Sequence, residues 1–378
     1  MILTEEQTMI RDMARDFAQN RLAPHSASFE DAEAIPKEVL REMGALGLMG
    51  MTVPESYGGA GADYVSYALA LMEIAAGDGA VSTVMSVNNS PCCAAFLKEG
   101  TEAQKEKFLT PVAKGEQIGA FCLTEPQAGS DASALKTRAR RDGDHFIISG
   151  TKQFITSGKI GGVALVFAVT DPEAGKKGIS CFIVPTDTPG YRVVSTEKKL
   201  GQKASDTCQI AFDEVKVPAA NLLGQEGAGY RIALANLETG RIGIAAQSVG
   251  MASAALAHAI TYAKERQSFG QPIIDHQAVG FRLADMATKV EVARQMVLHA
   301  ASLKDANLPC LTEASMAKLF ASEMAEEVCS AAIQTLGGNG YIADYPVEKI
   351  YRDVRVCQIY EGTSDIQKLV IVRNLAAM

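Results

Sequence analysis

The 378-residue chain contains no tryptophan, and none of its eight cysteines forms a C-x-x-C pair. Its five histidines are scattered, so neither residue type has the close spacing of a zinc or iron–sulfur site, and we expect no metal. Most of the cysteines lie in apolar runs such as 179–184, which is typical of reduced core residues in a cytosol-like compartment. Without an indole ring, any aromatic stacking on a ligand must come from Phe or Tyr.

Signals of several other protein classes are also missing. The formal net charge is −8 with no basic cluster to offset it, which argues against a nucleic-acid partner. No apolar run approaches the roughly 20 residues that span a bilayer, and residues 1–7 lack a signal or transit pattern. No G-x-G-x-x-G follows a predicted strand, and there is neither a P-loop nor a G-x-S-x-G elbow. We expect a cytoplasmic protein without a membrane span, with a mature mitochondrial matrix chain as the alternative.

The first third of the chain has the pattern of helices. Thr4 and Gln7 are spaced as a capping box, and Ile10, Met13 and Phe17 follow at helical spacing. Further helical runs are predicted at 37–46, 64–76 and 104–113. This part of the chain is therefore expected to form a helical domain.

Short strands and then long helices make up the rest of the chain. Strand-like segments separated by Gly, Pro and Asp lie at 121–124, 146–150, 163–169 and 180–184. Long helical patterns follow at 230–264, 276–303 and 312–336. We predict a mainly α fold with a central β-domain: an N-terminal helical domain (1–117), an antiparallel, barrel-like middle β-domain (118–225) and a C-terminal four-helix bundle domain (226–378).

One carboxylate near the end of the chain stands out. Glu361 lies between the apolar run 354–360 and Gly362. A Glu that is buried in such surroundings has a raised pKa, which suits a base that removes a weakly acidic proton near neutral pH. The alternative is that Glu361 merely caps the helix that begins near Ser364.

Two loops have a composition that fits ligand binding. The segment 121–131 joins a strand to a loop of turn residues, whose N–H groups and Ser130 Oγ could hold a phosphate. The segment 334–341 ends a helix in glycines, which allow positive φ and a close approach to a ligand. A capped strand end and a simple helix stop are the respective alternatives.

Taken together, short sequence motifs spread over essentially the whole length of this chain resemble those of the acyl-CoA dehydrogenase family of FAD flavoproteins. The matching strings, in family order, are 53–59, 123–126, 152–156, 240–243, 262–270, 334–341 and 360–364. The family's order of helical, β and helical domains agrees with the predicted fold.

The resemblance implies a catalytic role for Glu361. In the family the matching Glu takes the α-proton of an acyl-CoA thioester while the β-hydrogen leaves as hydride to flavin N5, which yields a trans-2-enoyl-CoA. Some members place the base at the position of Gly240 instead, so a glycine there favours Glu361.

The resemblance also implies ligand contacts. The FAD contacts that it assigns are Phe121, Leu123, Thr124, Gly129, Ser130, Phe154, Ile155, Thr156, Arg266, Phe269, His276, Gln277, Gln334, Gly337, Gly338, Thr363 and Asp365. The substrate contacts that it assigns are Ser130, Glu238, Arg241, Tyr360 and Gly362. Three positions depart from the common pattern: Gln127 replaces a Gly, Phe154 stands where Trp is common, and Asp365 replaces Gln or Glu.

Partners and alternatives complete the prediction. The resemblance implies electron-transfer flavoprotein as acceptor and a homo-oligomer, a tetramer, in which FAD is shared across a subunit boundary. The string 85–90 resembles short-chain members, which favours butyryl-like or short branched acyl-CoA. An acyl-CoA oxidase that uses oxygen is the second hypothesis, and a non-catalytic scaffold that retains the fold is the third.

Overall fold

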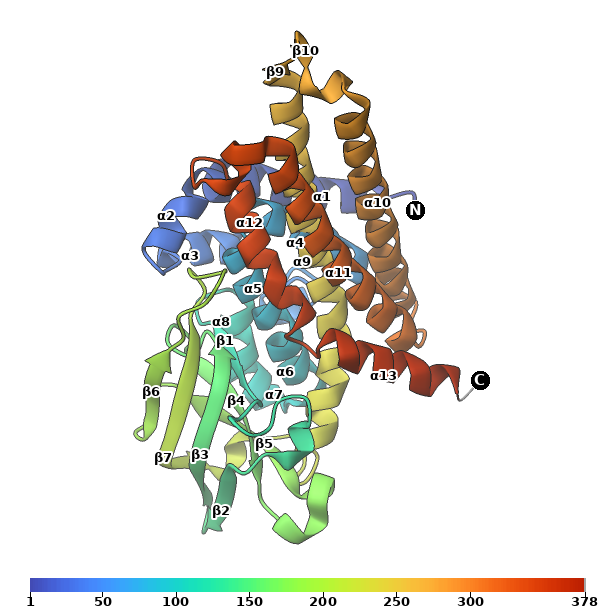
Figure 1. Ribbon diagram of the computed structural model, residues 1–378. Coiled ribbons are helices and arrows are strands. Elements are labelled where there is room, and N and C mark those ends of the chain that lie inside the picture. Colours follow the sequence, from blue (N-terminus) through green and yellow to red (C-terminus); the bar gives the residue numbers. More distant parts are fainter. Residues whose placement is uncertain (377–378) are drawn as a thin grey trace.

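Side-chain caps set where the first helices begin. Thr4 and Gln7 form the predicted capping box, and Asp63 and Asp78 accept from backbone N–H groups at the starts of the helices Tyr64–Gly77 (α4) and Gly79–Val87 (α5). The computed structural model describes residues 1–376 (Figure 1). Helices of the first third are α1 (Glu5–Phe17), α2 (Ser26–Asp31), α3 (Lys37–Ala45), α4 (Tyr64–Gly77), α5 (Gly79–Val87), α6 (Ala94–Glu99), α7 (Glu102–Gln104) and α8 (Thr110–Ala113).

The middle of the chain forms one sheet of eight strands. The strands are β1 (Gly119–Cys122), β2 (Arg138–Asp142), β3 (His145–Thr156), β4 (Val163–Val169), β5 (Ile179–Pro185), β6 (Tyr191–Thr196), β7 (Thr207–Pro218) and β8 (Leu222–Leu223). Their order is β6-β7-β3-β2-β4-β5-β8, with β1 also paired to β4. β4 and β5 are buried along almost their whole length, which explains their unbroken apolar sequence.

The sheet is mixed, whereas the sequence pattern predicts an antiparallel one. Most pairs are antiparallel, but β4 lies parallel to both β1 and β2. The reason is the connection: the β2–β3 hairpin intervenes between β1 and β4, so the chain returns in its original direction before it pairs. Strand composition alone does not specify that crossing.

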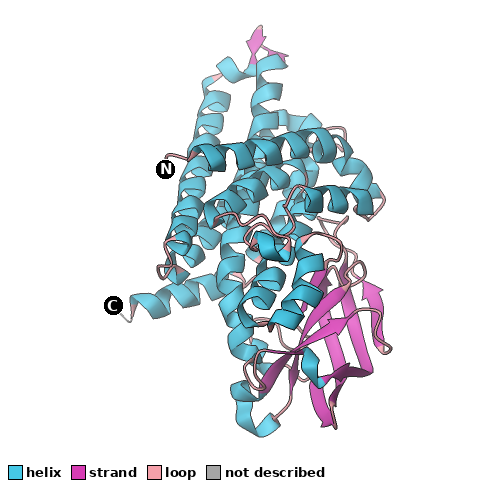
Figure 2. Cartoon of the chain, turned by 180° about the vertical axis from the view of Figure 1, so that it is seen from behind, coloured by secondary structure: helices cyan, strands magenta, loops and turns pink. Residues whose placement is uncertain are grey.

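Long helices make up the last part of the chain. They are α9 (Gly229–Glu265), α10 (Gln277–Asp305) and α11 (Leu311–Leu336), followed by the shorter α12 (Val347–Val354) and α13 (Ser364–Leu375). A hairpin of β9 (Gln267–Ser268) and β10 (Gln271–Pro272) joins α9 to α10. Figure 2 shows the sheet confined to one end of the molecule and the long helices running away from it. The proposed domain limits at 117/118 and 225/226 fall between elements.

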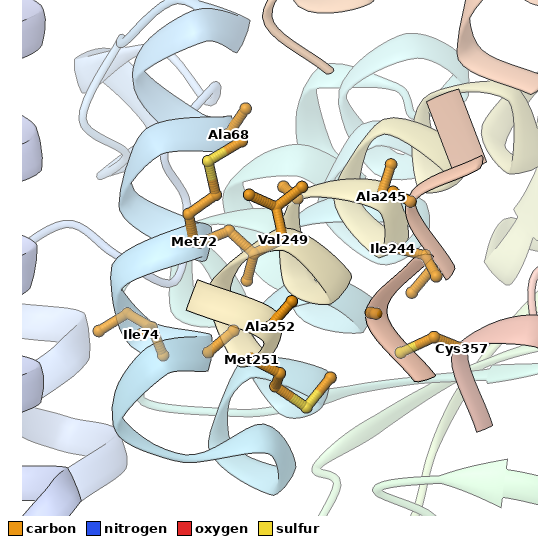
Figure 3. Packing of buried hydrophobic residues seen from close by; sticks show 14 of the residues in the cluster. Ala68, Met72, Ile74, Ile244, Ala245, Val249, Met251, Ala252 and Cys357 are labelled. Atoms are coloured by element: carbon orange, nitrogen blue, oxygen red, sulfur yellow. The ribbon is translucent and has the colours of Figure 1, made fainter. Parts of the chain in front are cut away.

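Small residues let α4 of the first third pack closely on α9. Val249 and Ala252 of α9 face Met72 of α4 in one apolar cluster (Figure 3). A Cβ placed on Gly250 would lie 2.1 Å from the Met72 carbonyl oxygen, so the two backbones could not approach this closely with any other residue. The bundle therefore includes a helix from the N-terminal third as well as the three long C-terminal helices.

The apolar character of α9 is explained by its position. By length and composition it could cross a membrane, with a mean hydropathy of 1.2 in its most apolar window, but 78% of that window is buried inside the fold. Burial against α4, α10 and α11 accounts for this composition.

Candidate active site

Glu361 sits in a left-handed turn between two helical segments. Its φ is +54°, and that of Gly362 is +88°. The cap of α13 is Thr363, whose Oγ1 accepts from the N–H of Ile366 at 3.3 Å, so the alternative that Glu361 caps this helix is wrong. The turn instead directs the Glu361 carboxylate toward α9.

The Glu361 carboxylate is held in a setting that favours a proton acceptor. Its Oε2 is buried and has no hydrogen-bond partner among residues 1–376. A Cβ placed on Gly240 would lie 2.6 Å from this oxygen, so the glycine makes room for the carboxylate. Burial raises the pKa of Glu361 to about 7, against the opposing effect of Lys318 and Arg241, which lower it.

Two cationic side chains flank this carboxylate. Arg241, on α9, is buried and donates from Nη1 to Ser315 Oγ at 3.1 Å; burial lowers its pKa. Lys318, on α11, is fully buried and donates from Nζ to the Gly362 carbonyl at 2.8 Å. Glu238, the other residue expected on the substrate-binding helix, accepts from Cys310 Sγ at 3.7 Å.

Sequence reasoning missed Lys318, although the sequence contains a signal for it. Lys318 falls on the same helical stripe as Ala314, Ala321 and Ala325, all of which are buried. A lysine within an apolar stripe cannot be a solvated surface charge. Gln367, one turn into α13, was missed as well, and it donates to the Gly362 carbonyl at 2.9 Å.

The neighbour of the candidate base is anchored by its own network. The hydroxyl of Tyr360 donates to Gln247 Oε1, and Gln247 Nε2 donates to Thr83 Oγ1 at 2.6 Å. Thr83 in turn donates to Gln202 Oε1 at 2.5 Å. This chain of hydrogen bonds links the segment before Glu361 to α9, to α5 and to the loop before β7.

The loop that was predicted to hold a phosphate is organised around a buried ion pair. Glu125 accepts from Lys152 Nζ at 2.8 Å and from the N–H groups of Lys136 and Thr137 at 2.6 and 2.9 Å. Burial raises the pKa of Glu125, but Lys152 and the N–H donors outweigh it and hold that pKa at about 2. Gln127, which departs from the family pattern, donates its amide to Glu125 Oε2 at 2.6 Å, so it supports the same loop.

Residues predicted to contact the flavin gather along this loop and along β3. Phe154 is 63% exposed within a strand and has a φ of +58°, while its neighbour Ile155 is buried. A Cβ placed on Gly129 would meet no atom of the described residues within 4 Å, so this loop borders open space. The rest of this group are the half-buried Phe121, Thr124 and Thr156, the buried Leu123 and the exposed Ser130. An exposed aromatic face beside a bare glycine loop fits a planar ligand that carries phosphate.

A second group of predicted cofactor residues lies at the opposite end of the molecule (Figures 1 and 2). Arg266, the C-cap of α9, and Phe269, in the turn between β9 and β10, are both exposed. His276 Nε2 lies 3.0 Å from the Ser268 carbonyl oxygen. The exposed Gln277, Gln334, Gly337 and Gly338 belong to the same end. Thr363 and the exposed Asp365 lie at the start of α13, beside Glu361. We call the predicted cofactor residues at this end, from Arg266 to Gly338, the hairpin group, and those along β3 and the loop around Gly129 the β3 group. Within one chain the two groups are far apart.

The order of helical, β and helical domains, and a Glu whose Oε2 is buried beside the long helix α9, both agree with the family that the sequence resembles. The chain belongs to the acyl-CoA dehydrogenase family, a family of FAD flavoproteins. Profiles for the family's N-terminal, middle and C-terminal domains match residues 4–116, 120–215 and 227–376.

Two relatives are similar to this chain over almost its full length. The chain is 49% identical over 375 residues to an acyl-CoA dehydrogenase of Bacillus subtilis, covering 99% of both chains. It is 46% identical over 373 residues to the mitochondrial short-chain specific acyl-CoA dehydrogenase of Bos taurus, covering 99% of this chain and 90% of that one.

Solved structures superpose closely. Butyryl-CoA dehydrogenase of Megasphaera elsdenii matches with a TM-score of 0.97 and 42% identity over 100% of this chain and 99% of that one. A chain from a study of the electron transferring flavoprotein of Acidaminococcus fermentans matches with a TM-score of 0.98 and 46% identity over 99% of both chains. A glutaryl-CoA dehydrogenase of Mycobacterium smegmatis in complex with FADH2 gives 0.94 and 34% over 100% and 96%.

Proposed function

We propose that the protein is an FAD-dependent dehydrogenase that converts a short-chain acyl-CoA to its trans-2-enoyl-CoA. The observation that carries this proposal is the Glu361 carboxylate, whose Oε2 is buried without a hydrogen-bond partner among residues 1–376 and faces Gly240. Burial of a carboxylate oxygen without a partner costs folding free energy, and groups of this kind concentrate at functional sites.

Glu361 acts as the base that removes the α-proton. With a pKa raised to about 7, it accepts a proton more readily than an ordinary carboxylate and is still about half ionised at neutral pH. The thioester α-proton is too weakly acidic for a carboxylate alone, so the developing charge on the thioester oxygen must be stabilised. We assign this role in part to the backbone N–H of Glu361.

Flavin binding is supported by the chemistry of the residues present. The Phe154 face and the loop around Gly129 would hold the ring and the pyrophosphate, and Thr156 would contact the ring edge. Arg266 suits a phosphate because its guanidinium can donate two parallel N–H groups. When bound, the flavin supplies the acceptor for the β-hydride.

The substrate class follows from the relatives. Full-length similarity to a short-chain specific enzyme and to a butyryl-CoA dehydrogenase favours a butyryl-like acyl group. Ser130, Glu238, Arg241, Tyr360 and Gly362 are the proposed substrate contacts.

Partners and location belong to the proposal as well. Electron-transfer flavoprotein is the proposed acceptor, supported by the structural match from work on such a flavoprotein. We further propose a cytoplasmic homotetramer, because the hairpin group and the β3 group of cofactor residues lie at opposite ends of one chain.

The central test is the substitution Glu361→Gln in the FAD-loaded protein. We expect the variant to retain FAD and to lose nearly all flavin bleaching by butyryl-CoA, since an amide cannot accept the α-proton. Bleaching at the wild-type rate would refute the assignment of the base. A series of acyl-CoAs of increasing length tests the substrate class, with the butyryl compound expected to react fastest.

The two rival hypotheses give different readouts in the same material. An oxidase would form peroxide in air at the rate of turnover. A scaffold would stay colourless after addition of FAD.

A further inference from the structure

Two buried side chains hold the turn that carries Glu361. Lys318 of α11 donates from Nζ to the Gly362 carbonyl at 2.8 Å, and Gln367 of α13 donates from Nε2 to the same carbonyl at 2.9 Å. The Gln367 amide also lies 3.3 Å from the Glu361 carbonyl. Both side chains are fully buried. The turn is therefore tied to two helices that are separate in the sequence.

The turn needs such ties because its backbone is strained. Glu361 has a φ of +54°, a region that a residue with a Cβ adopts only when its surroundings impose it. A Cβ placed on Gly362 would lie 2.8 Å from Gln367 Nε2, so only glycine leaves space for this amide. The tethers and the glycine together determine where the carboxylate points.

Lys318 also contributes a charge. A buried lysine is normally paired with a carboxylate, whereas Lys318 donates to a backbone carbonyl. Four ionisable groups interact electrostatically with the Glu361 carboxylate: Lys318 from α11, Arg241 from α9, Tyr67 from α4, and Cys92. Of these, Lys318 and Arg241 are cationic, and both lower the pKa of Glu361 against the effect of burial. Burial in turn lowers the pKa of Lys318 itself to about 8.

We propose that Lys318 and Gln367 are positioning residues for proton transfer by Glu361, and that the nearby Lys318 ammonium in addition favours the ionised form of the carboxylate. The proposal rests on the role of Glu361 as the base. It assigns the two residues different parts: Gln367 supplies geometry alone, whereas Lys318 supplies geometry and charge. Neither residue needs to touch the substrate.

The test compares Lys318→Met with Gln367→Met in the FAD-loaded enzyme. The control is Lys289→Met on α10, whose ammonium pairs only with the exposed carboxylates of Asp285 and Glu327 among the described residues. For both test variants we expect kcat to fall about 10- to 100-fold with KM changed far less, because a small displacement of a base has effects of that size. Only Lys318→Met is expected to move the acid limb of the pH–rate profile, upward by about one pH unit, since only it removes a cation. The control should match the wild type.

A direct readout separates positioning from general damage to the fold. The infrared carboxyl band that Glu361→Gln abolishes reports protonation of Glu361 without turnover, and in Lys318→Met it should persist to higher pH. An unmoved band and acid limb in Lys318→Met would overturn the charge role, and kcat within twofold of wild type in both variants would overturn positioning.

If Lys318→Met does not fold, Lys318→Gln removes the charge while keeping an N–H donor, and the same band decides. Failure of this proposal can be distinguished from failure of the proposed function. If Glu361 were not the base, the Glu361→Gln variant itself would retain turnover.

Discussion

At the scale of single residues, Gly240 and Glu361 depend on each other. The glycine lies in the interior of α9, where it weakens the helix relative to alanine by roughly 0.5–1 kcal/mol. Its value is the space that it leaves, since an added Cβ would lie 2.6 Å from Glu361 Oε2 and 3.0 Å from Cδ. The helix gives up local stability so that the carboxylate can approach it.

This dependence predicts that Gly240→Ala separates stability from activity. The variant should melt no lower than the wild type, because alanine is the better helix former. Its kcat should fall by about 10- to 100-fold, since the carboxylate must move away from the new methyl group. Thermal melting and steady-state rates with butyryl-CoA measure the two effects. The control is Gly280→Ala on α10, where the nearest atom is 3.2 Å from the added Cβ and activity should be unchanged. Full activity in Gly240→Ala would show that the carboxylate has another position available.

The sequence predicts that Glu361 is unusual, but it does not predict the side chains that hold the turn around it. The apolar run before Glu361 and the glycine after it are local signals, so the unusual carboxylate can be found by reading. The ties from Lys318 and Gln367 depend on how α11 and α13 pack on the turn, and that information is not local. The partner of Gln127 is of the same kind, because it depends on how the loop folds back on Glu125.

At the scale of elements, one buried ionic cluster joins the three parts of the fold. Lys349 of α12 donates to Asp353 at 2.7 Å and to Asp78, the cap of α5, at 3.1 Å. Asp353 also accepts from the backbone N–H of Gln202 in the loop before β7. Burial opposes the charge on Lys349, but the two carboxylates outweigh it and raise its pKa above the ordinary value.

We therefore expect Lys349→Met to destabilise the protein by about 3–5 kcal/mol, the usual cost of leaving buried charges without their partner. The midpoint of denaturant unfolding, measured by circular dichroism, reports the loss. Lys105→Met serves as the control, because Lys105 pairs with the exposed Glu102 near the surface, and its midpoint should stay at the wild-type value. An equal midpoint for Lys349→Met would mean that the two carboxylates find another partner or take up protons.

Elements are predicted well where periodicity is local and long. The helix expected at 312–336 is observed as Leu311–Leu336, and the one expected at 276–303 as Gln277–Asp305. The mixed pairing of β4 is not predictable in this way, since the direction of a neighbouring strand depends on the path of the chain between strands.

At the scale of the whole molecule, the proposed cofactor site is divided between two ends. The β3 group, which includes Phe154, lies on the sheet, and the hairpin group, which includes Arg266 and Phe269, lies at the far end of the long helices. Phe269 is 96% exposed, and Tyr341 is 85% exposed. Aromatic side chains are enriched at the interfaces between protein chains relative to the rest of the surface. A second copy of the chain that covers the hairpin would both bury these rings and bring its own β3 group to Arg266.

Because the proposed cofactor residues lie at two ends of one chain, we expect Phe269→Ser to weaken both assembly and cofactor retention. The fold of a single chain should be unharmed. The side chain contributes little to the described chain because it is almost fully exposed, so far-ultraviolet circular dichroism should be unchanged. Sedimentation should give a smaller mass than for the wild type, and gel filtration should release more FAD, because the hairpin of one copy would no longer be held against the flavin site of another. Val194→Ser replaces an exposed apolar residue on β6, away from the hairpin, and should alter neither property. If Phe269→Ser kept the wild-type mass but lost FAD, the hairpin would bind the cofactor without forming the subunit boundary; if it kept both, the hairpin would have no part in either.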